Sequence, residues 1–232
     1  MTIMAKKKGI VKKIILGIIG TIILFIVIVI VNLIVVKKNA SVVSKGQPIK
    51  TYSEHNYALL VIDIQEATTG EFSMYPFFKK NSDDLIKNIN QIVKSLKSQN
   101  NPVIYVRSEI TNPLVNLINS SYEKGSPGAK NDKRLNIVSG LEVIKSGKDS
   151  FRNTNLDSIL TSNKVNELYI VGLDAAECIN ATVEAAQNRQ YKVNIIKEGV
   201  ISKSERRTDS MMVCFRDRGV RVVQIDSLVL TK

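Results

Sequence analysis

Apolar runs alternate with amphipathic segments between residues 57 and 225, and this pattern predicts a parallel α/β domain. Tyr57–Gln65 and Leu168–Val171 are short and almost wholly apolar, as in strands that are buried on both faces of a sheet. Asp84–Gln99 instead repeats apolar residues at helical spacing, with Ser82 or Asp83 as the expected N-cap. Further strands are expected at 102–107, 141–144, 192–196 and 220–225, and further helices at 154–160, from 175 onward and at 205–216. Strands and helices that alternate in this way predict a doubly wound, Rossmann-like parallel sheet with helices on both faces.

A long apolar segment precedes this domain and predicts a transmembrane helix. Ile14–Val36 is apolar except for Thr21, Asn32 and two glycines, and as a helix it reaches about 34 Å, enough to cross a bilayer. The run is too long for the core of a signal peptide, and no small-x-small cleavage site follows it. We therefore expect a basic flank at 1–13, an uncleaved anchor at 14–36, a polar linker at 37–56 and the globular domain at 57–232.

The charge of the chain belongs mainly to this N-terminal segment. The net charge is +12, but residues 1–50 carry nine lysines and no acidic residue, which leaves the rest of the chain at +3. This distribution favours a membrane surface over a nucleic acid as the partner. Five lysines precede the apolar run and four follow it, so the positive-inside rule predicts a single-pass protein with its domain outside the cytoplasm. The opposite topology stays open, and protection of the domain from protease on intact cells would refute this prediction.

The two cysteines do not form a disulfide framework or a zinc motif. Cys178 and Cys214 are too few for such a framework, and no CxxC or Cys/His pattern is present. A single disulfide between them stays possible in an oxidising compartment. The amphipathic helical pattern around Cys214 explains that residue as part of the core.

Three ionisable residues follow predicted strands and are candidates for chemistry. Asp63, Lys145 and Cys178 each lie where a strand ends, and such ends can converge on one crevice of a doubly wound sheet. Cys178 also falls near the start of a helix, after a turn at Gly172, where the helix dipole lowers the pKa of a thiol. Each residue alone has a structural explanation: a capping carboxylate, a surface charge and a buried thiol. His55, the only histidine, precedes the first strand, so a Cys–His dyad is not expected.

Four segments in this order resemble the isochorismatase-like cysteine hydrolase family over residues 57–225. They are the first strand with its aspartate, the loop GSPGA, the lysine segment, and the segment that contains Gly172, Cys178, Thr182 and Ala185 (58–65, 125–129, 143–156 and 171–185). The resemblance implies a hydrolase that cleaves a C–N bond of a small amide or ureido compound. In that mechanism Cys178 attacks the carbonyl carbon to form a thioester, and Asp63 moves the protons. Lys145 holds both groups electrostatically.

The resemblance also implies a set of supporting positions. Backbone N–H groups of Asp174 and Cys178 would form the oxyanion hole, after a cis Leu173–Asp174 peptide bond. Lys145 is preferred to Lys148 as the family lysine because it lies six residues before Phe151 and at a strand end. The residues expected to contact substrate are Glu66, Phe72, Tyr75 and Phe151.

Neither a cofactor nor a metal is expected. Nicotinamidases of the family carry an Asp/His metal cluster after the first strand, but residues 66–80 contain no histidine. The resemblance also makes a homo-oligomer possible. A different class of function stays open, that of a membrane-bound scaffold or binding protein that has kept the fold and lost catalysis. Rapid alkylation of Cys178 near neutral pH would favour the enzyme over this scaffold.

Overall fold

The computed structural model describes residues 2–97 and 101–229, which form two compact units. One unit ends at Asn39 and the other begins at Ala40, so each is described by itself. The first unit consists of the helix α1 (Thr2–Ala40) without Ala40, which belongs to the second unit. It contains the predicted anchor 14–36 and continues through Lys37 and Lys38, so helix replaces the first residues of the predicted linker.

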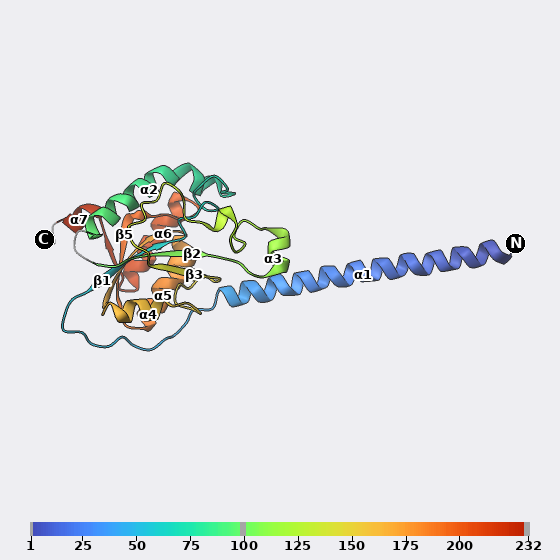
Figure 1. The fold of residues 1–232 in the computed structure, drawn as a ribbon, viewed down its shortest axis with the longest axis horizontal. Coiled ribbons are helices and arrows are strands. Elements are labelled where there is room, and N and C mark those ends of the chain that lie inside the picture. The colour runs from blue at the N-terminus through green and yellow to red at the C-terminus, as the bar shows by residue number, and fades with distance from the viewer. Residues whose placement is uncertain (1, 98–100, 230–232) are drawn as a thin grey trace. The chain divides into compact units, whose positions relative to one another are not determined.

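The second unit is built on a six-stranded parallel sheet (Figure 1). The strand order is β3-β2-β1-β4-β5-β6, and every described pair of neighbouring strands is parallel. The strands are β1 (Tyr57–Ile62), β2 (Val103–Ser108), β3 (Glu142–Lys145), β4 (Glu167–Gly172), β5 (Lys192–Val200) and β6 (Arg221–Val223). The chain reverses its direction of winding between β1 and β4, and the doubly wound fold predicted from the sequence is thereby confirmed.

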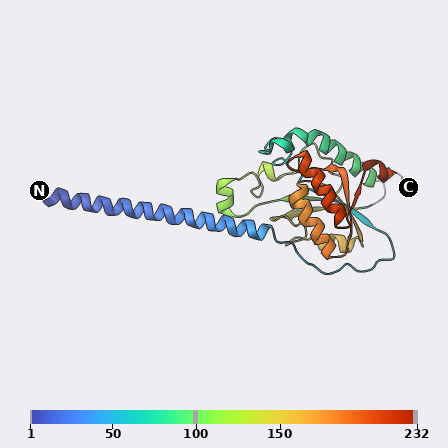
Figure 2. The same ribbon diagram turned by 180° about the vertical axis from the view of Figure 1, so that it is seen from behind.

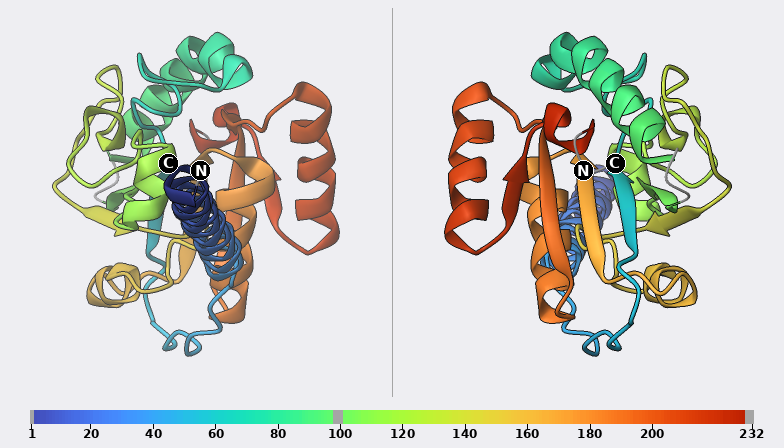
Figure 3. Two further views of the ribbon diagram at one scale, coloured as in Figure 1. Left: turned by 90° about the vertical axis from the view of Figure 1, so that its right-hand side faces the viewer. Right: turned by 90° about the vertical axis from the view of Figure 1, so that its left-hand side faces the viewer.

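Helices cover both faces of the sheet. Successive side chains of a strand point to opposite faces, so each buried strand contributes to an apolar cluster on either side. In β1, Leu60 and Ile62 pack into one apolar cluster, and Leu59 and Val61 pack into the other. The first cluster includes residues of α4 (Leu156–Ser162), α5 (Asn180–Asn188) and α6 (Glu205–Asp217); the second includes residues of α2 (Pro76–Lys97) and α7 (Ile225–Val229). Figure 2 shows α5 and α6 on the side turned towards the viewer, and Figure 3 shows the sheet from its two ends.

The helix α2 begins eight residues earlier than its apolar pattern predicts. It starts at Pro76, whose fixed φ and missing N–H suit the first position of a helix. The prediction of Ser82 or Asp83 as the N-cap is therefore wrong, and the Ser82 hydroxyl donates to the carbonyl of Lys79 inside the helix at 2.9 Å. The predicted end at Gln99 lies outside the described residues.

The long polar segment 108–136 is more ordered than a plain loop. It contains the short helix α3 (Pro113–Ile118), whose first N–H groups donate to the side chain of Asn112. A 3-10 turn follows at Pro127–Ala129, with Ser126 as its cap. Both helical pieces begin with proline after a capping side chain, which is a typical start signal.

Residues 41–56 have no regular secondary structure, yet they are attached to the domain rather than free. The backbone N–H and the hydroxyl of Ser44 donate to one oxygen of Asp149, at 2.8 and 2.6 Å. The N–H of Ile49 donates to the carbonyl of Arg189 at 2.9 Å, and Val43 and Ile49 pack against the core. We call residues 41–49 the strap.

Candidate active site

The candidate site lies at the carboxyl ends of the four strands around the point where the winding reverses. Asp63 follows β1, Ser108 ends β2, Lys145 ends β3, and Cys178 follows β4 after a turn. Parallel strands present their carboxyl ends at one edge of the sheet, and the loops there diverge at the reversal to leave a crevice. The fold therefore brings together the three residues that the sequence singles out, and adds Ser108.

Unusual backbone conformations point these side chains into the crevice. Asp63 has a φ of +56°, in the left-handed region that aspartate tolerates better than most residues. Gly172 has a φ of +118°, and a Cβ atom there would lie 2.0 Å from the carbonyl oxygen of Ile62. After a cis peptide bond between Leu173 and Asp174, as the resemblance implies, a single π-helical turn at 175–179 presents Cys178.

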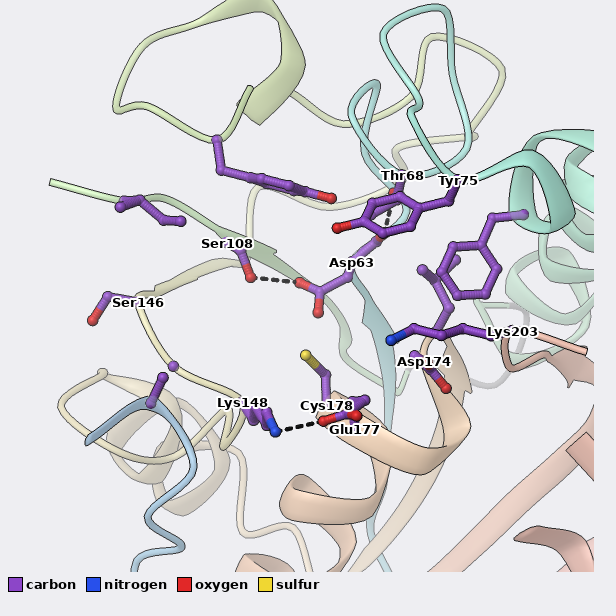
Figure 4. A pocket seen from close by; sticks show the side chains of 16 residues that line it. Asp63, Thr68, Tyr75, Ser108, Ser146, Lys148, Asp174, Glu177, Cys178 and Lys203 are labelled. Atoms are coloured by element: carbon purple, nitrogen blue, oxygen red, sulfur yellow. Dashed lines mark hydrogen bonds and ion pairs between the residues drawn. The ribbon is translucent and has the colours of Figure 1, made fainter. Parts of the chain in front are cut away.

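The ammonium of Lys145 connects the other groups. Its Nζ atom lies 2.8 Å from Asp63 Oδ2 and 3.3 Å from Cys178 Sγ. It also lies 2.9 Å from Ser108 Oγ and 3.1 Å from the carbonyl oxygen of Gly147, and the Ser108 hydroxyl in turn donates to Asp63 Oδ1 at 3.0 Å. Figure 4 shows Asp63, Ser108 and Cys178 turned towards one another. The geometry favours Lys145 over Lys148 as the lysine of the site.

Burial and the neighbouring charges shift the pKa values of Cys178 and Lys145. Burial, followed by the Asp63 carboxylate, raises the pKa of the Cys178 thiol to about 12, although Lys145 opposes this shift. Burial also disfavours the Lys145 ammonium, but Asp63 and Cys178 outweigh that effect and raise the pKa of Lys145. The prediction that the helix dipole lowers the pKa of the Cys178 thiol is therefore wrong, because burial and the Asp63 carboxylate dominate.

A pocket of about 350 Å³ opens above these groups. Asp63, Ser108 and Cys178 contribute to its lining, and the other walls are partly apolar or aromatic and partly charged, the charged ones being Lys148, Asp174, Glu177 and Lys203. The larger apolar and aromatic residues of the lining are Tyr75, Phe78, Ile110, Tyr122 and Leu173. Lys148 also lines the pocket and forms an ion pair with Glu177 at 2.5 Å. The volume suits a small molecule or the head of a larger one.

Of the four residues predicted to contact substrate, Tyr75 alone is among the described residues that line this pocket. Glu66 is buried, and its carboxylate accepts hydrogen bonds from the N–H groups of Glu71 and Lys133. Phe72 is exposed on the loop before α2, whereas Phe151 lies in the core beneath the guanidinium of Arg189. The positions of Glu66 and Phe151 argue for structural roles, because nearby backbone or core groups already occupy both side chains.

Several residues that line the pocket were missed in the sequence, and Ser108 and Tyr122 are two of them. Ser108 ends a strand, so the rule that selected Lys145 could have selected it as well. Tyr122 comes from the polar segment 108–136 and lies beside the pocket because its hydroxyl reaches the carbonyl of Ala67 at 3.4 Å. Burial is the largest of the effects that raise the pKa of Tyr122. No pattern in the sequence distinguishes it from its polar neighbours.

The Asp174 carboxylate is tied to the turn that precedes Cys178. Its Oδ1 atom accepts from the N–H of Ala176 at 2.9 Å and from the hydroxyl of Ser202. Asp174 and Cys178 both line the pocket. Within the described part of the chain, no group of three or more His, Cys, Asp or Glu side chains is placed to hold a metal ion.

Comparisons with known proteins identify the family of the domain. Residues 57–227 match the family model of the isochorismatase domain. N-carbamoylsarcosine amidase from an Arthrobacter species is 28% identical over 156 residues, 62% of this chain and 58% of that protein. The secreted isochorismatase effector Isc1 of Verticillium dahliae is 25% identical over 158 residues, 67% of this chain and 77% of that protein.

Solved structures share the fold at lower identity. N-carbamoylsarcosine amidase from Thermoplasma acidophilum has a TM-score of 0.62 at 21% identity, covering 73% of this chain and 96% of that one. A cysteine hydrolase from Pseudomonas syringae has a TM-score of 0.65 at 18% identity, covering 79% of this chain and 96% of that one.

Proposed function

The chain belongs to the isochorismatase family of hydrolases, and from this we propose that it cleaves a C–N bond of an amide or ureido compound through Cys178, Asp63 and Lys145. The observation that carries the proposal is the position of Lys145 Nζ, within hydrogen-bond reach of both Asp63 Oδ2 and Cys178 Sγ. A nucleophile, a base and a cation in mutual contact at the floor of a pocket are what covalent catalysis by a thiol requires.

In the first half of the reaction the Asp63 carboxylate takes the proton of the Cys178 thiol as Sγ attacks the carbonyl carbon. The high pKa of the resting thiol means that the proton leaves only as the new S–C bond forms. The tetrahedral intermediate then collapses, the C–N bond breaks, and the departing nitrogen takes the proton from Asp63. The product on the enzyme is a thioester on Cys178.

In the second half, water replaces the amine. Asp63 takes one proton of the water, and the resulting hydroxide attacks the thioester carbon. The C–S bond breaks, the acid is released, and Cys178 Sγ takes the proton back from Asp63. Lys145 stays protonated through both halves, as its raised pKa implies, and stabilises negative charge on Sγ.

The backbone N–H groups of Asp174 and Cys178 are proposed as the donors to the carbonyl oxygen as it gains negative charge. Both residues line the pocket next to Sγ. One such donor contributes about 2.7–4 kcal/mol to transition-state stabilisation in other acyl transfers.

We also place this hydrolase on a membrane, through α1. The segment Ile10–Ala40 is long and apolar enough to cross a bilayer by its length and composition. Its apolar side chains from Ile14 to Val35 are about half exposed along the helix, and water is a costly environment for so much apolar surface. The lysine counts, five before the apolar run and four after it, support a domain outside the cytoplasm.

The test offers a panel of small amides and N-carbamoyl compounds to the full chain in detergent. Hydrolysis is measured as the release of ammonia. Cys178→Ala should reduce turnover to background, and Asp63→Asn should reduce it by about 10²–10⁴-fold, as expected for loss of a general base. Cys214→Ala is the matched control and should keep full activity. Mass spectrometry of the wild type, quenched during turnover, should find the acyl group on Cys178.

Activity that survives Cys178→Ala in a folded protein would refute the mechanism. If the wild type hydrolyses no member of the panel yet binds these compounds in its pocket, the scaffold interpretation would replace the enzyme.

A further inference from the structure

The pocket that contains Cys178 begins where the apolar helix ends. Ala40, the last residue of α1 and the first of the globular unit, lines the pocket. Its carbonyl oxygen accepts from the N–H of Lys148 at 2.8 Å, and Lys148 lines the same pocket. One wall of the pocket is therefore continuous with the helix through the covalent chain.

Because Ala40 belongs to the globular unit, the covalent chain limits how far the pocket can lie from the membrane surface, whatever direction α1 takes. Lys37 and Lys38 precede Ala40 by three and two residues, which is less than about 5 Å of helix rise. Lysines at the end of a membrane-spanning helix lie at the level of the lipid headgroups. The strap cannot lengthen this connection, since it follows Ala40 and is itself bound to the domain through Ser44 and Asp149.

Two uncharged segments flank the same pocket. Residues 72–78 and 110–122 contain no charged residue, in a chain of which 23% is charged. Tyr75 and Phe78 of the first segment, and Ile110 and Tyr122 of the second, line the pocket. Four of the seven residues in the first segment are aromatic, and aromatic residues are enriched at the membrane interface.

Apolar side chains of these segments are exposed to solvent. Met74 is 74% exposed, and Leu117 and Ile118 at the end of α3 are 71% and 61% exposed. In Figure 1, α3 projects from the domain at the end where the strands finish. Exposed apolar side chains in the two segments that also line the pocket are typical of a membrane or protein interface. The continuity with α1 selects the membrane.

We propose that the rim of the active-site pocket docks on the bilayer that holds α1, and that the hydrolase takes amphiphilic amides from that bilayer. Met74, Leu117 and Ile118 enter the interface. The amide head of the substrate reaches Cys178, while its hydrocarbon chain stays among the lipids or against the apolar walls of the pocket. This inference rests on the membrane anchor and the hydrolase activity proposed above.

Docking is tested by tryptophan fluorescence, which needs no activity assay. The chain contains no tryptophan, so a single introduced tryptophan reports on its own position. The full chain is reconstituted in phosphatidylcholine vesicles with plain or brominated acyl chains, and single tryptophans are introduced as Leu117→Trp, Val213→Trp and Val31→Trp. Val213 is 53% exposed on α6 and is the matched control; Val31 reports whether α1 is inserted. We expect brominated lipid to quench the fluorescence of Leu117→Trp and Val31→Trp at least twofold and to leave Val213→Trp unchanged.

Each other outcome overturns the docking proposal. Quenching of Val31→Trp without quenching of Leu117→Trp means that the pocket rim stands clear of the bilayer. Failure of Val31→Trp to respond removes the anchor and the docking together. Equal quenching of Leu117→Trp and Val213→Trp means that the domain contacts lipid without a preferred face.

The substrate class is tested with two primary amides in the same vesicles, one with a two-carbon and one with a sixteen-carbon acyl chain. We expect the wild type to hydrolyse the long-chain amide at least tenfold faster at equal total concentration. Leu117→Lys should lower the ratio of long-chain to short-chain rates at least tenfold, and Val213→Lys should leave the ratio unchanged. Hydrolysis of the short amide alone would overturn the substrate class and keep the hydrolase. Hydrolysis of neither amide would refute the substrate class too, and the panel of small amides would decide whether the hydrolase itself fails.

Discussion

The ion pair between Lys145 and Asp63 provides the most direct test of the site. Both side chains are buried, with exposed fractions of 0% and 6%, and their charged atoms lie 2.8 Å apart. Lys145→Met removes the cation, keeps a side chain of similar length, and leaves the Asp63 carboxylate in the interior without its counter-charge. We expect this single change to destabilise the domain far more than a surface substitution would.

The magnitude follows from the distance. Two unit charges 2.8 Å apart attract by about 6 kcal/mol at an effective dielectric constant of about 20. Desolvation offsets part of this attraction in the intact pair, but it still penalises the charge that remains when one partner is removed. Loss of one member of a buried pair costs about 3–5 kcal/mol, and we expect Lys145→Met to lie in this range.

The assay is a double-mutant cycle. Urea unfolding of the full chain in mild detergent at pH 7 is monitored by circular dichroism. The variants are Lys145→Met, Asp63→Asn and the double variant. The double variant should be more stable than Lys145→Met alone, because it leaves no unpaired buried charge. The expected coupling is about 2–4 kcal/mol, within the range of contacting residues in one network or slightly above it.

A control cycle uses an exposed ion pair of the same domain. Lys133 and Glu71 lie 3.7 Å apart with side chains 74% and 70% exposed, so Lys133→Met and Glu71→Gln should couple by no more than about 1 kcal/mol. If the buried cycle couples as weakly as this exposed one, the charges of the site do not interact as described. If Lys145→Met does not fold but the double variant does, the coupling is at least as large as expected.

Two further predictions concern the thiol and the turn before it. Burial and the Asp63 carboxylate raise the pKa of Cys178 to about 12, so iodoacetamide should label this residue slowly at pH 7 and progressively faster up to pH 10. The labelling rate at neutral pH therefore no longer separates the enzyme from a scaffold, and turnover of the amide panel takes its place as the discriminating measurement. Asp63→Asn removes the opposing charge and should speed labelling at pH 7 by about tenfold or more; a wild-type rate that levels off below pH 8 would contradict the assignment. Gly172→Ala should destabilise the domain by about 2–5 kcal/mol in urea unfolding, since its Cβ would lie 2.0 Å from the Ile62 oxygen at a positive φ. Gly140→Ala meets no atom within 4 Å and should change stability little; equal effects at the two glycines would refute this account of the turn.

Hydrophobic periodicity was enough to predict most of the sheet, because strands buried on both faces are continuous apolar runs. The predicted strands at 102–107 and 141–144 differ from β2 and β3 by a single residue at each end. The start of α2 was not predictable in the same way. Pro76 and the aromatic residues after it resemble a loop in sequence, and only packing on the sheet and on Tyr75 makes them helical.

The sequence by itself determined which groups are candidates for the chemistry and the order in which the strands deliver them. Asp63, Lys145 and Cys178 are conspicuous because a charge or a thiol at the end of a buried strand needs a partner or a task. Only the tertiary structure decided their electrostatics. A helix start predicts a lowered thiol pKa, but the pKa of Cys178 depends on burial and on a carboxylate that is 115 positions away in the chain. Burial and a long-range charge together raise this pKa, and no local pattern of residues contains that information.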